Sequence, residues 1–106
     1  MFGGIMEIML TFDEKVATMK VDGIITSDNS YVFQEKLNEV LKSDAKKLEI
    51  DLSACRNMSS IGIGKLLLFY KDFINRNGEI EIVKSSPAVY ELFTTIKLNQ
   101  LININL

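Results

Sequence analysis

Two spacings of apolar residues alternate along this chain, and their order limits the possible fold more than any other feature. Apolar residues at every second position are typical of strands, and those at every third or fourth position are typical of helices. The strand spacing occupies five segments, which are residues 5–11, 15–21, 47–53, 79–85 and, at the end, 101–106. A polar turn joins the first two, which predicts a β-hairpin whose second strand ends at Asp22-Gly23.

The helical spacing occupies three segments that lie between these strands. The first helix is expected over about Ser30–Lys42 and the second over about Ile61–Arg76. A third helix is expected to begin at Pro87, because Ser86 is a good N-cap residue and proline favours the first helical position. Together with the strands, these helices give the order ββαβαβαβ.

This order predicts one α/β domain with a mixed β-sheet and covering helices, because strands that alternate with helices pair in parallel and need cover. A chain of 106 residues is the size of a single domain. Hydrophobic residues make up 47% of it, which is enough for a core without a disulfide or a metal.

The charge of the chain excludes several classes of partner. The formal net charge is −2, and no basic run is longer than Lys46-Lys47. Nucleic acid and anionic membrane surfaces attract basic faces, so we expect neither as a partner. The first residues lack the positive start of a signal peptide, and no segment has the roughly 20 apolar residues of a membrane span. We therefore expect a cytoplasmic, bacterial-style protein.

Missing residue types narrow the chemistry. The chain has no histidine and one cysteine, Cys55. Ser-His and Cys-His catalysis, imidazole metal ligands and an internal disulfide are therefore not available within it. We expect no cofactor, no metal and no enzymatic activity. A serine hydrolase would need Lys65 as the base for Ser59 or Ser60.

The segment NMSSIGIGKLLLFY, residues 57–70, places two serines and two glycines where the second helix begins. One interpretation is structural, with Ser59 or Ser60 capping the free N–H groups of the helix. Gly62 and Gly64 would then allow another part of the chain, or a partner, to come close. The other interpretation is a switch. A helix N-terminus tolerates the charge of about −2 that phosphorylation adds, whereas a partner docked over the same hydroxyl does not.

The longer segment LEIDLSACRNMSSIGIGKLLLFYKDF, residues 48–73, resembles the signature of STAS domains, in particular of anti-sigma factor antagonists. The length and the order of elements match over the whole chain. The resemblance implies a STAS-like fold and a regulatory module that sequesters an anti-sigma factor, a partner that can also be a serine kinase. Gly62 and Gly64 match two glycines of the family, so Ser60 matches the serine that is phosphorylated.

The same resemblance assigns partner binding to the loop before the second helix and to the start of that helix. The residues expected there are Asn57, Met58, Ser59, Ser60, Ile61, Gly62 and Lys65. For Met58, a place in the core is the favoured alternative. The exposed face of the second helix is expected to add an apolar patch. At least one of Phe69, Tyr70 and Phe73 would reach solvent on that face.

Two acidic positions of the family are not acidic here. The acid usual before the phosphorylated serine falls on Ser59, and the acid usual after the second strand falls on Thr26. In the family, such acids help the site to engage the kinase. Their replacement favours an alternative, a STAS interaction subunit of a transport or signalling complex that is not phosphorylated. Nucleotide binding and the oligomeric state stay open at this point.

Overall fold

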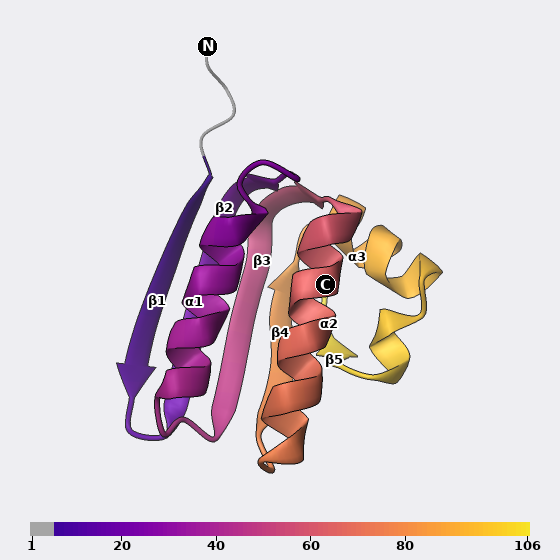
Figure 1. The fold of residues 1–106 in the computed structure, drawn as a ribbon. Coiled ribbons are helices and arrows are strands. Elements are labelled where there is room, and N and C mark those ends of the chain that lie inside the picture. Colours follow the sequence, from indigo (N-terminus) through magenta and orange to yellow (C-terminus); the bar gives the residue numbers. More distant parts are fainter. Residues whose placement is uncertain (1–5) are drawn as a thin grey trace.

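The computed structural model describes residues 6–106, in which five strands form one mixed sheet in the order β1-β2-β3-β4-β5 (Figure 1). The strands are Glu7–Asp13 (β1), Val16–Ile25 (β2), Lys47–Met58 (β3), Glu79–Ser85 (β4) and Asn103–Ile104 (β5). β1 and β2 form the predicted antiparallel hairpin, and every later pair of neighbours is parallel.

Within residues 6–106, three α-helices and a short 3-10 helix connect the parallel strands. They are Ser30–Lys42 (α1), Ser60–Asn75 (α2), Pro87–Thr95 (α3) and Leu98–Gln100 (η1). Helices α1 and α2 lie side by side over one face of the sheet, and α3 packs near β3 (Figure 1). The predicted α/β fold and the order ββαβαβαβ are confirmed. None of the helices in this part of the chain is long and apolar enough to cross a membrane.

The core lies between the sheet and the pair α1 and α2. Ile50 and Leu52 in β3 have no solvent exposure, and neither do Phe33 of α1 and Phe73 of α2. Side chains alternate between the two faces of a strand. The residues that alternate with these two in β3 are therefore on the other face, where they are polar and at least partly exposed.

Three strands continue beyond their predicted ends. β1, predicted over 5–11, ends at Asp13, and residue 5 lies outside the described residues. β2 passes through Asp22 and Gly23 and ends at Ile25. Gly23 has a φ of 113°, and the register with β3 shifts on both sides of this pair of residues. The Asp-Gly signal therefore marks an irregularity inside the strand rather than a turn. β3 continues to Met58, because Cys55 and Met58 are still buried in the core.

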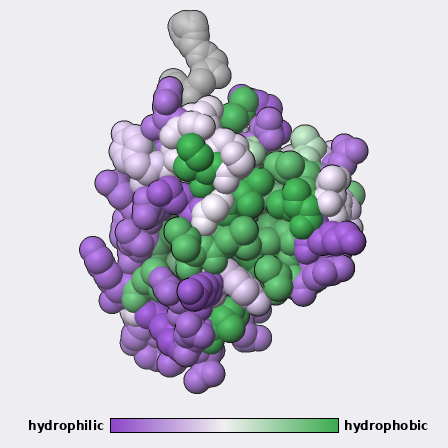
Figure 2. Space-filling view, turned by 45° about the vertical axis from the view of Figure 1, so that its right-hand side comes forward, coloured by the Kyte–Doolittle hydropathy of each residue, from purple (hydrophilic) through white to green (hydrophobic). Residues whose placement is uncertain are grey.

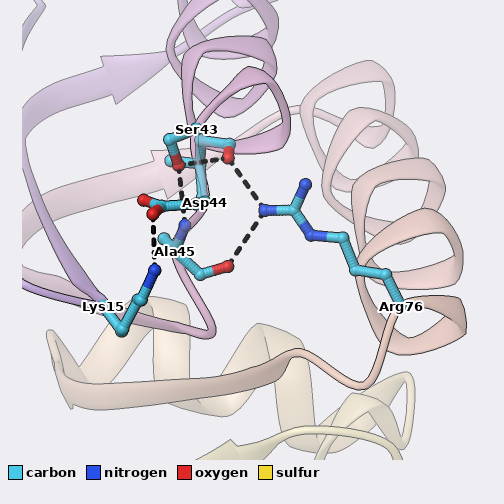
Figure 3. Close-up of polar contacts among 6 residues, drawn as sticks. Lys15, Ser43, Asp44, Ala45 and Arg76 are labelled. Atoms are coloured by element: carbon cyan, nitrogen blue, oxygen red, sulfur yellow. Dashed lines mark hydrogen bonds and ion pairs between the residues drawn. The ribbon is translucent and has the colours of Figure 1, made fainter.

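The C-terminal end of α2 is tied to the end of α1. Arg76 donates a hydrogen bond from Nη1 to the main-chain oxygen of Leu41 at 2.6 Å. Its Nη2 donates to the oxygens of Val40 and Ala45 at 3.1 and 3.0 Å (Figure 3). The guanidinium also lies over the Phe73 ring, 4.9 Å from its centroid. One side chain thus satisfies carbonyls at the end of α1 and in the loop that follows.

The turn between β1 and β2 is joined to the same loop. Lys15 forms an ion pair with Asp44 (Figure 3), and the hydrogen bond from its ammonium holds the pKa of the Asp44 carboxyl below the ordinary value of 3.8. The main-chain oxygen of Lys15 accepts hydrogen bonds from the N–H groups of Lys46 and Lys47 at 2.7 and 3.1 Å. Three segments far apart in the sequence therefore meet at this end of the molecule.

Candidate functional site

The loops that follow β2 and β3 meet beyond the C-terminal ends of these strands, because the two strands are parallel. Their last residues, Ile25 and Met58, are direct neighbours in the sheet. The N–H of Ser59 donates to the oxygen of Ile25 at 2.8 Å. In the loop before α1, Thr26 and Asn29 are joined by two reciprocal hydrogen bonds of 2.7 and 3.2 Å. Hydrogen bonds therefore hold both loops at the end of the sheet where α2 begins.

The two adjacent serines have different places at the start of α2. Ser59 is the N-cap: its backbone is extended, and its Oγ accepts a hydrogen bond from the Gly62 N–H at 3.1 Å. Its main-chain oxygen accepts from the Ile63 N–H at 2.9 Å. Ser60 is the first helical residue and is exposed. The cap therefore does not depend on the Ser60 hydroxyl.

The two glycines also differ. A Cβ at Gly62 would lie 2.8 Å from Cγ2 of Ile25 and 2.9 Å from Cγ of Met58. A residue without a side chain therefore lets α2 begin this close to the ends of β2 and β3. At Gly64 an added Cβ would meet no atom of residues 6–106 within 4 Å. The close approach of another part of the chain is confirmed at Gly62. At Gly64 no other element of the described chain comes close, and the approach of a partner stays a prediction.

Two residues that were expected on the partner surface are buried. Met58 is the last residue of β3 and still belongs to the core, and Gly62 is covered by Ile25 and Met58. The core position favoured for Met58 is confirmed, and the surface position expected for Gly62 is corrected, because the chain stays buried up to the start of the helix. Both residues can affect a partner only indirectly, by fixing where Ser59 and Ser60 lie.

Lys65 points away from Ser60. It is half-buried and lines a groove between α1 and α2 together with Leu41 and Asp72. A residue five positions further along an α-helix is rotated by about 140° around its axis. Lys65 therefore lies on the side of α2 that faces α1, and not beside the Ser60 hydroxyl.

Exposed apolar residues occur on two sides of α2. Ile61 is 48% exposed and Leu68 is 62% exposed on the side of Lys65, and Leu68 lines the same groove. Leu67 and Ile74 are exposed on the side of Ser60. Figure 2 shows apolar side chains gathered over a broad area of one face of the molecule. Large apolar areas of this kind on a small domain are typical of protein-binding surfaces.

Of the three aromatic residues of which at least one was expected to reach solvent, Tyr70 does so in part. Phe69 and Phe73 are buried and stacked, with ring centroids 4.9 Å apart, and Tyr70 is half-buried. The exposed apolar area comes instead from leucine and isoleucine. The signal was the run of three leucines at 66–68: a helix can direct only part of such a run into the core, and here Leu66 is the buried one.

The start of α2 has no acidic residue in its first turn. Asn57, just before it, is exposed, and its Oδ1 accepts a hydrogen bond from the Met58 N–H at 2.8 Å. Within residues 6–106, no group of three or more Cys, Asp or Glu side chains is arranged to hold a metal ion. The partial positive charge of the helix end is therefore not neutralised by a carboxylate of its own first turn.

Two titratable groups of β3, Cys55 and Asp51, have shifted pKa values. Burial raises the pKa of the Cys55 thiol, so this cysteine is a protonated core residue rather than a nucleophile. Asp51 accepts hydrogen bonds from the Ser53 Oγ and N–H at 2.6 and 2.9 Å. Desolvation opposes ionisation of Asp51, but the hydrogen bonds from Ser53 prevail and lower the pKa of its carboxyl.

Comparison with protein families matches residues 7–106 to the family described as STAS domain. Solved structures with the same fold include an anti-sigma factor antagonist from Mycobacterium paratuberculosis, with a TM-score of 0.84 at 20% identity over 94% of this chain and 85% of that one. The anti-sigma factor antagonist SpoIIAA in its unphosphorylated form has a TM-score of 0.80 at 14% identity, over 94% and 89%. The Bacillus cell fate determinant SpoIIAA in its phosphorylated form has 0.74 at 13%, over 94% and 92%. At these identities the likeness shows the fold.

Proposed function

Because the chain belongs to the STAS-domain family, we propose that it acts as an anti-sigma factor antagonist. It would bind an anti-sigma factor in the cytoplasm, release a sigma factor from it, and so change transcription. The likeness to two anti-sigma factor antagonists supports this role. The role is that of a binding module, which agrees with a chain that has no histidine base for its serines.

The observation that carries the proposal is that Ser59 and Ser60 have different structural roles. Ser59 supplies the cap of α2, and Ser60 is exposed as the first helical residue. A phosphate on Ser60 would lie at a helix N-terminus, where a negative charge of about −2 is favourable. The fold is therefore expected to survive phosphorylation. A fold match to SpoIIAA in both its unphosphorylated and phosphorylated forms supports this expectation.

The surroundings of Ser60 explain how a phosphate would release a partner. Gly64 and Leu67 follow Ser60 at i+4 and i+7, on the same side of α2, and the exposed Ile61 is its neighbour. A partner that packs on these apolar residues also removes water from the Ser60 hydroxyl. Burying a phosphate there without a charged counterpart would cost several kcal/mol. One group would thus control the interface without reshaping the domain.

The test is capture of partners from a lysate of the protein's own cell, followed by mass spectrometry. We expect wild type and Ser60→Ala to capture an anti-sigma factor and Ser60→Asp to lose it. Ser59→Asp is the matched control, because aspartate is a good N-cap residue and adds the same charge one position earlier. It should retain the partner. Capture by Ser60→Asp at the wild-type level, or no anti-sigma factor with wild type, would contradict the proposal.

A second candidate is a STAS interaction subunit that is not phosphorylated. It is favoured by one observation: Thr26 and Ser59 stand where the family carries acids. The two candidates separate when the protein is incubated with ATP and kinases from its own cell and the mass of the Ser60 peptide is measured. Stoichiometric phosphate on Ser60 of wild type supports the switch. The Ser59→Asp variant, which restores an acid before Ser60, is the positive control: phosphate on Ser60 of this variant but not of wild type supports the second candidate.

A further inference from the structure

β1 is an open edge of the sheet. It pairs with β2 alone among residues 6–106, in an unbroken register over all seven residues. Natural sheets protect their edges with short strands, bulges, proline or charges. β5, the opposite edge, has only two residues. β1 has no such protection: its acidic residues, Glu7 and Asp13, are at its ends, and Ile8–Phe12 between them is uncharged.

The two faces of this edge differ. On the face toward the helices, Ile8 and Leu10 pack against the core but stay half-buried, and Phe12 is 46% exposed. On the face away from the helices, Met9 is 67% exposed and is the apolar residue between Glu7 and Thr11. Unpaired main-chain groups beside an apolar face form a template for another strand of the same pattern.

We propose that β1 pairs antiparallel with β1 of a second copy of this chain, so that two sheets join across a two-fold axis at Met9. The second copy is the natural occupant because an isologous pair presents the same pattern from both sides. The half-buried Ile8 of one copy then faces Leu10 of the other. Each side chain covers the part of its counterpart that α1 leaves exposed to solvent. β1 is at the edge of the sheet farther from α2 (Figure 1), so the inference does not depend on the proposed function.

Charge selects the register. An axis through Leu10 would place Glu7 opposite Asp13 at both ends of the strand pair, and like charges directly opposite each other are destabilising. An axis through Met9 places Glu7 opposite Thr11 instead. The Met9 register therefore keeps the apolar pairing and removes the repulsion.

Disulfide formation tests the register. Directly opposite residues have Cβ atoms about 5 Å apart, which a disulfide can bridge. In Met9→Cys the two new thiols face each other on the axis. In Thr11→Cys, on the same face, they are separated by four residues, or about 13 Å. The native Cys55 is buried and does not compete.

With a mild oxidant, we expect Met9→Cys to form linked dimers at least about ten times faster than Thr11→Cys, because disulfide geometry requires the Cα atoms within about 7 Å. Equal rates for the two variants would contradict the register. The absence of linked dimers from both would contradict the pairing itself.

Sedimentation velocity tests the dimer without oxidation. A single strand pair is a small interface, so the protein should be measured at a concentration on the order of 0.5 mM. Met9→Lys places two like charges at the axis and should give a monomer. The control is Leu106→Lys, because Leu106 is 68% exposed and Met9 is 67% exposed. It should dimerise like wild type. A monomeric wild type, or a dimer that Leu106→Lys breaks and Met9→Lys does not, would overturn the proposal.

Discussion

The two ends of α2 are held in opposite ways. At its C-terminal end, Arg76 makes three hydrogen bonds to main-chain oxygens of α1 and the following loop and lies over Phe73. At its N-terminal end, the Ser59 hydroxyl makes one capping bond, the Ser59 N–H donates to the Ile25 oxygen, and Ser60 beside it is exposed. The side-chain bonds at the first end join segments 31 to 36 residues apart, whereas the side-chain bond at the second spans three, and its long-range contact comes from the main chain.

This difference separates stability from regulation along one helix. The Arg76 end fixes α2 against α1, and Gly62 and the Ser59 N–H fix its start on the sheet, so the position of the helix does not depend on the Ser60 hydroxyl. A charge or a partner can then be added at Ser60 without loss of the fold. If this account is right, substitutions at the Arg76 end should change stability strongly, and a substitution at Ser60 should change binding alone.

The largest effect on stability is expected for Arg76→Ala. It removes the Arg76 donors from the main-chain oxygens of Leu41, Val40 and Ala45, of which the Val40 oxygen keeps its hydrogen bonds from Ser43. It should lower the free energy of unfolding by about 3 kcal/mol. Urea denaturation measures this change. The exposed Arg56 provides the control, since Arg56→Ala should stay within about 0.5 kcal/mol of wild type. If Arg76→Ala and Arg56→Ala lowered the free energy of unfolding equally, Arg76 would not hold the C-terminal end of α2 in the way described.

A smaller effect is expected for Gly62→Ala, with Gly64→Ala as its matched control. The methyl group at residue 62 would collide with Ile25 and Met58, and overpacking of this kind costs about 2 kcal/mol. At residue 64 the methyl group has open space, so replacing a helical glycine should stabilise the protein by about 0.8 kcal/mol. Thermal unfolding should show opposite signs. The same sign for both would contradict the packing described at the start of α2.

The next comparison is between the two serines. Ser59→Ala removes the cap of α2 and should destabilise the protein by about 1 kcal/mol. Ser60→Ala removes a hydroxyl that the cap does not use, and it should stay within about 0.5 kcal/mol of wild type. Denaturation of the two variants side by side measures the difference. A larger loss for Ser60→Ala would mean that its hydroxyl supports the fold and is not free for a switch.

The smallest effect concerns pH and belongs to the Arg76 end. The hydrogen bond from Lys15 lowers the pKa of Asp44 in the folded state. A lowered folded-state pKa contributes stability above the ordinary value of 3.8, and this stability is lost as the pH falls through the folded-state value. In a carbon-13 titration, the Asp44 carboxyl should have its midpoint below 3.8 in wild type and return toward 3.8 in Lys15→Ala. An unchanged midpoint would show that the ion pair does not form in solution.

Much of the fold was predictable because its signals are local. The bounds of α1 and β4 and the Ser86-Pro87 start of α3 agree with the sequence, since apolar spacing and capping residues are read within a few positions. Asp22-Gly23 misled for the same reason. The pair has the chemistry of a turn, and only its pairing with β3 shows that the strand continues.

The site was predictable in its place and less so in its detail. The sequence identified the start of α2 and left open which serine caps it. The hydrogen bond from Gly62 to Ser59 resolves that choice. The burial of Met58 and the turn of Lys65 toward α1 depend on how α2 sits on the sheet. Arg76 gave no local signal, because its partners lie more than 30 residues away.

The most direct test of the central claim is a calorimetric titration of the anti-sigma factor captured by wild type. It would be titrated with this protein carrying either serine or phosphoserine at position 60. The account predicts binding at least tenfold weaker with phosphoserine, a difference of about 1.4 kcal/mol, and a melting temperature that does not fall. Equal affinity of the two forms, or unfolding of the phosphorylated one, would contradict it.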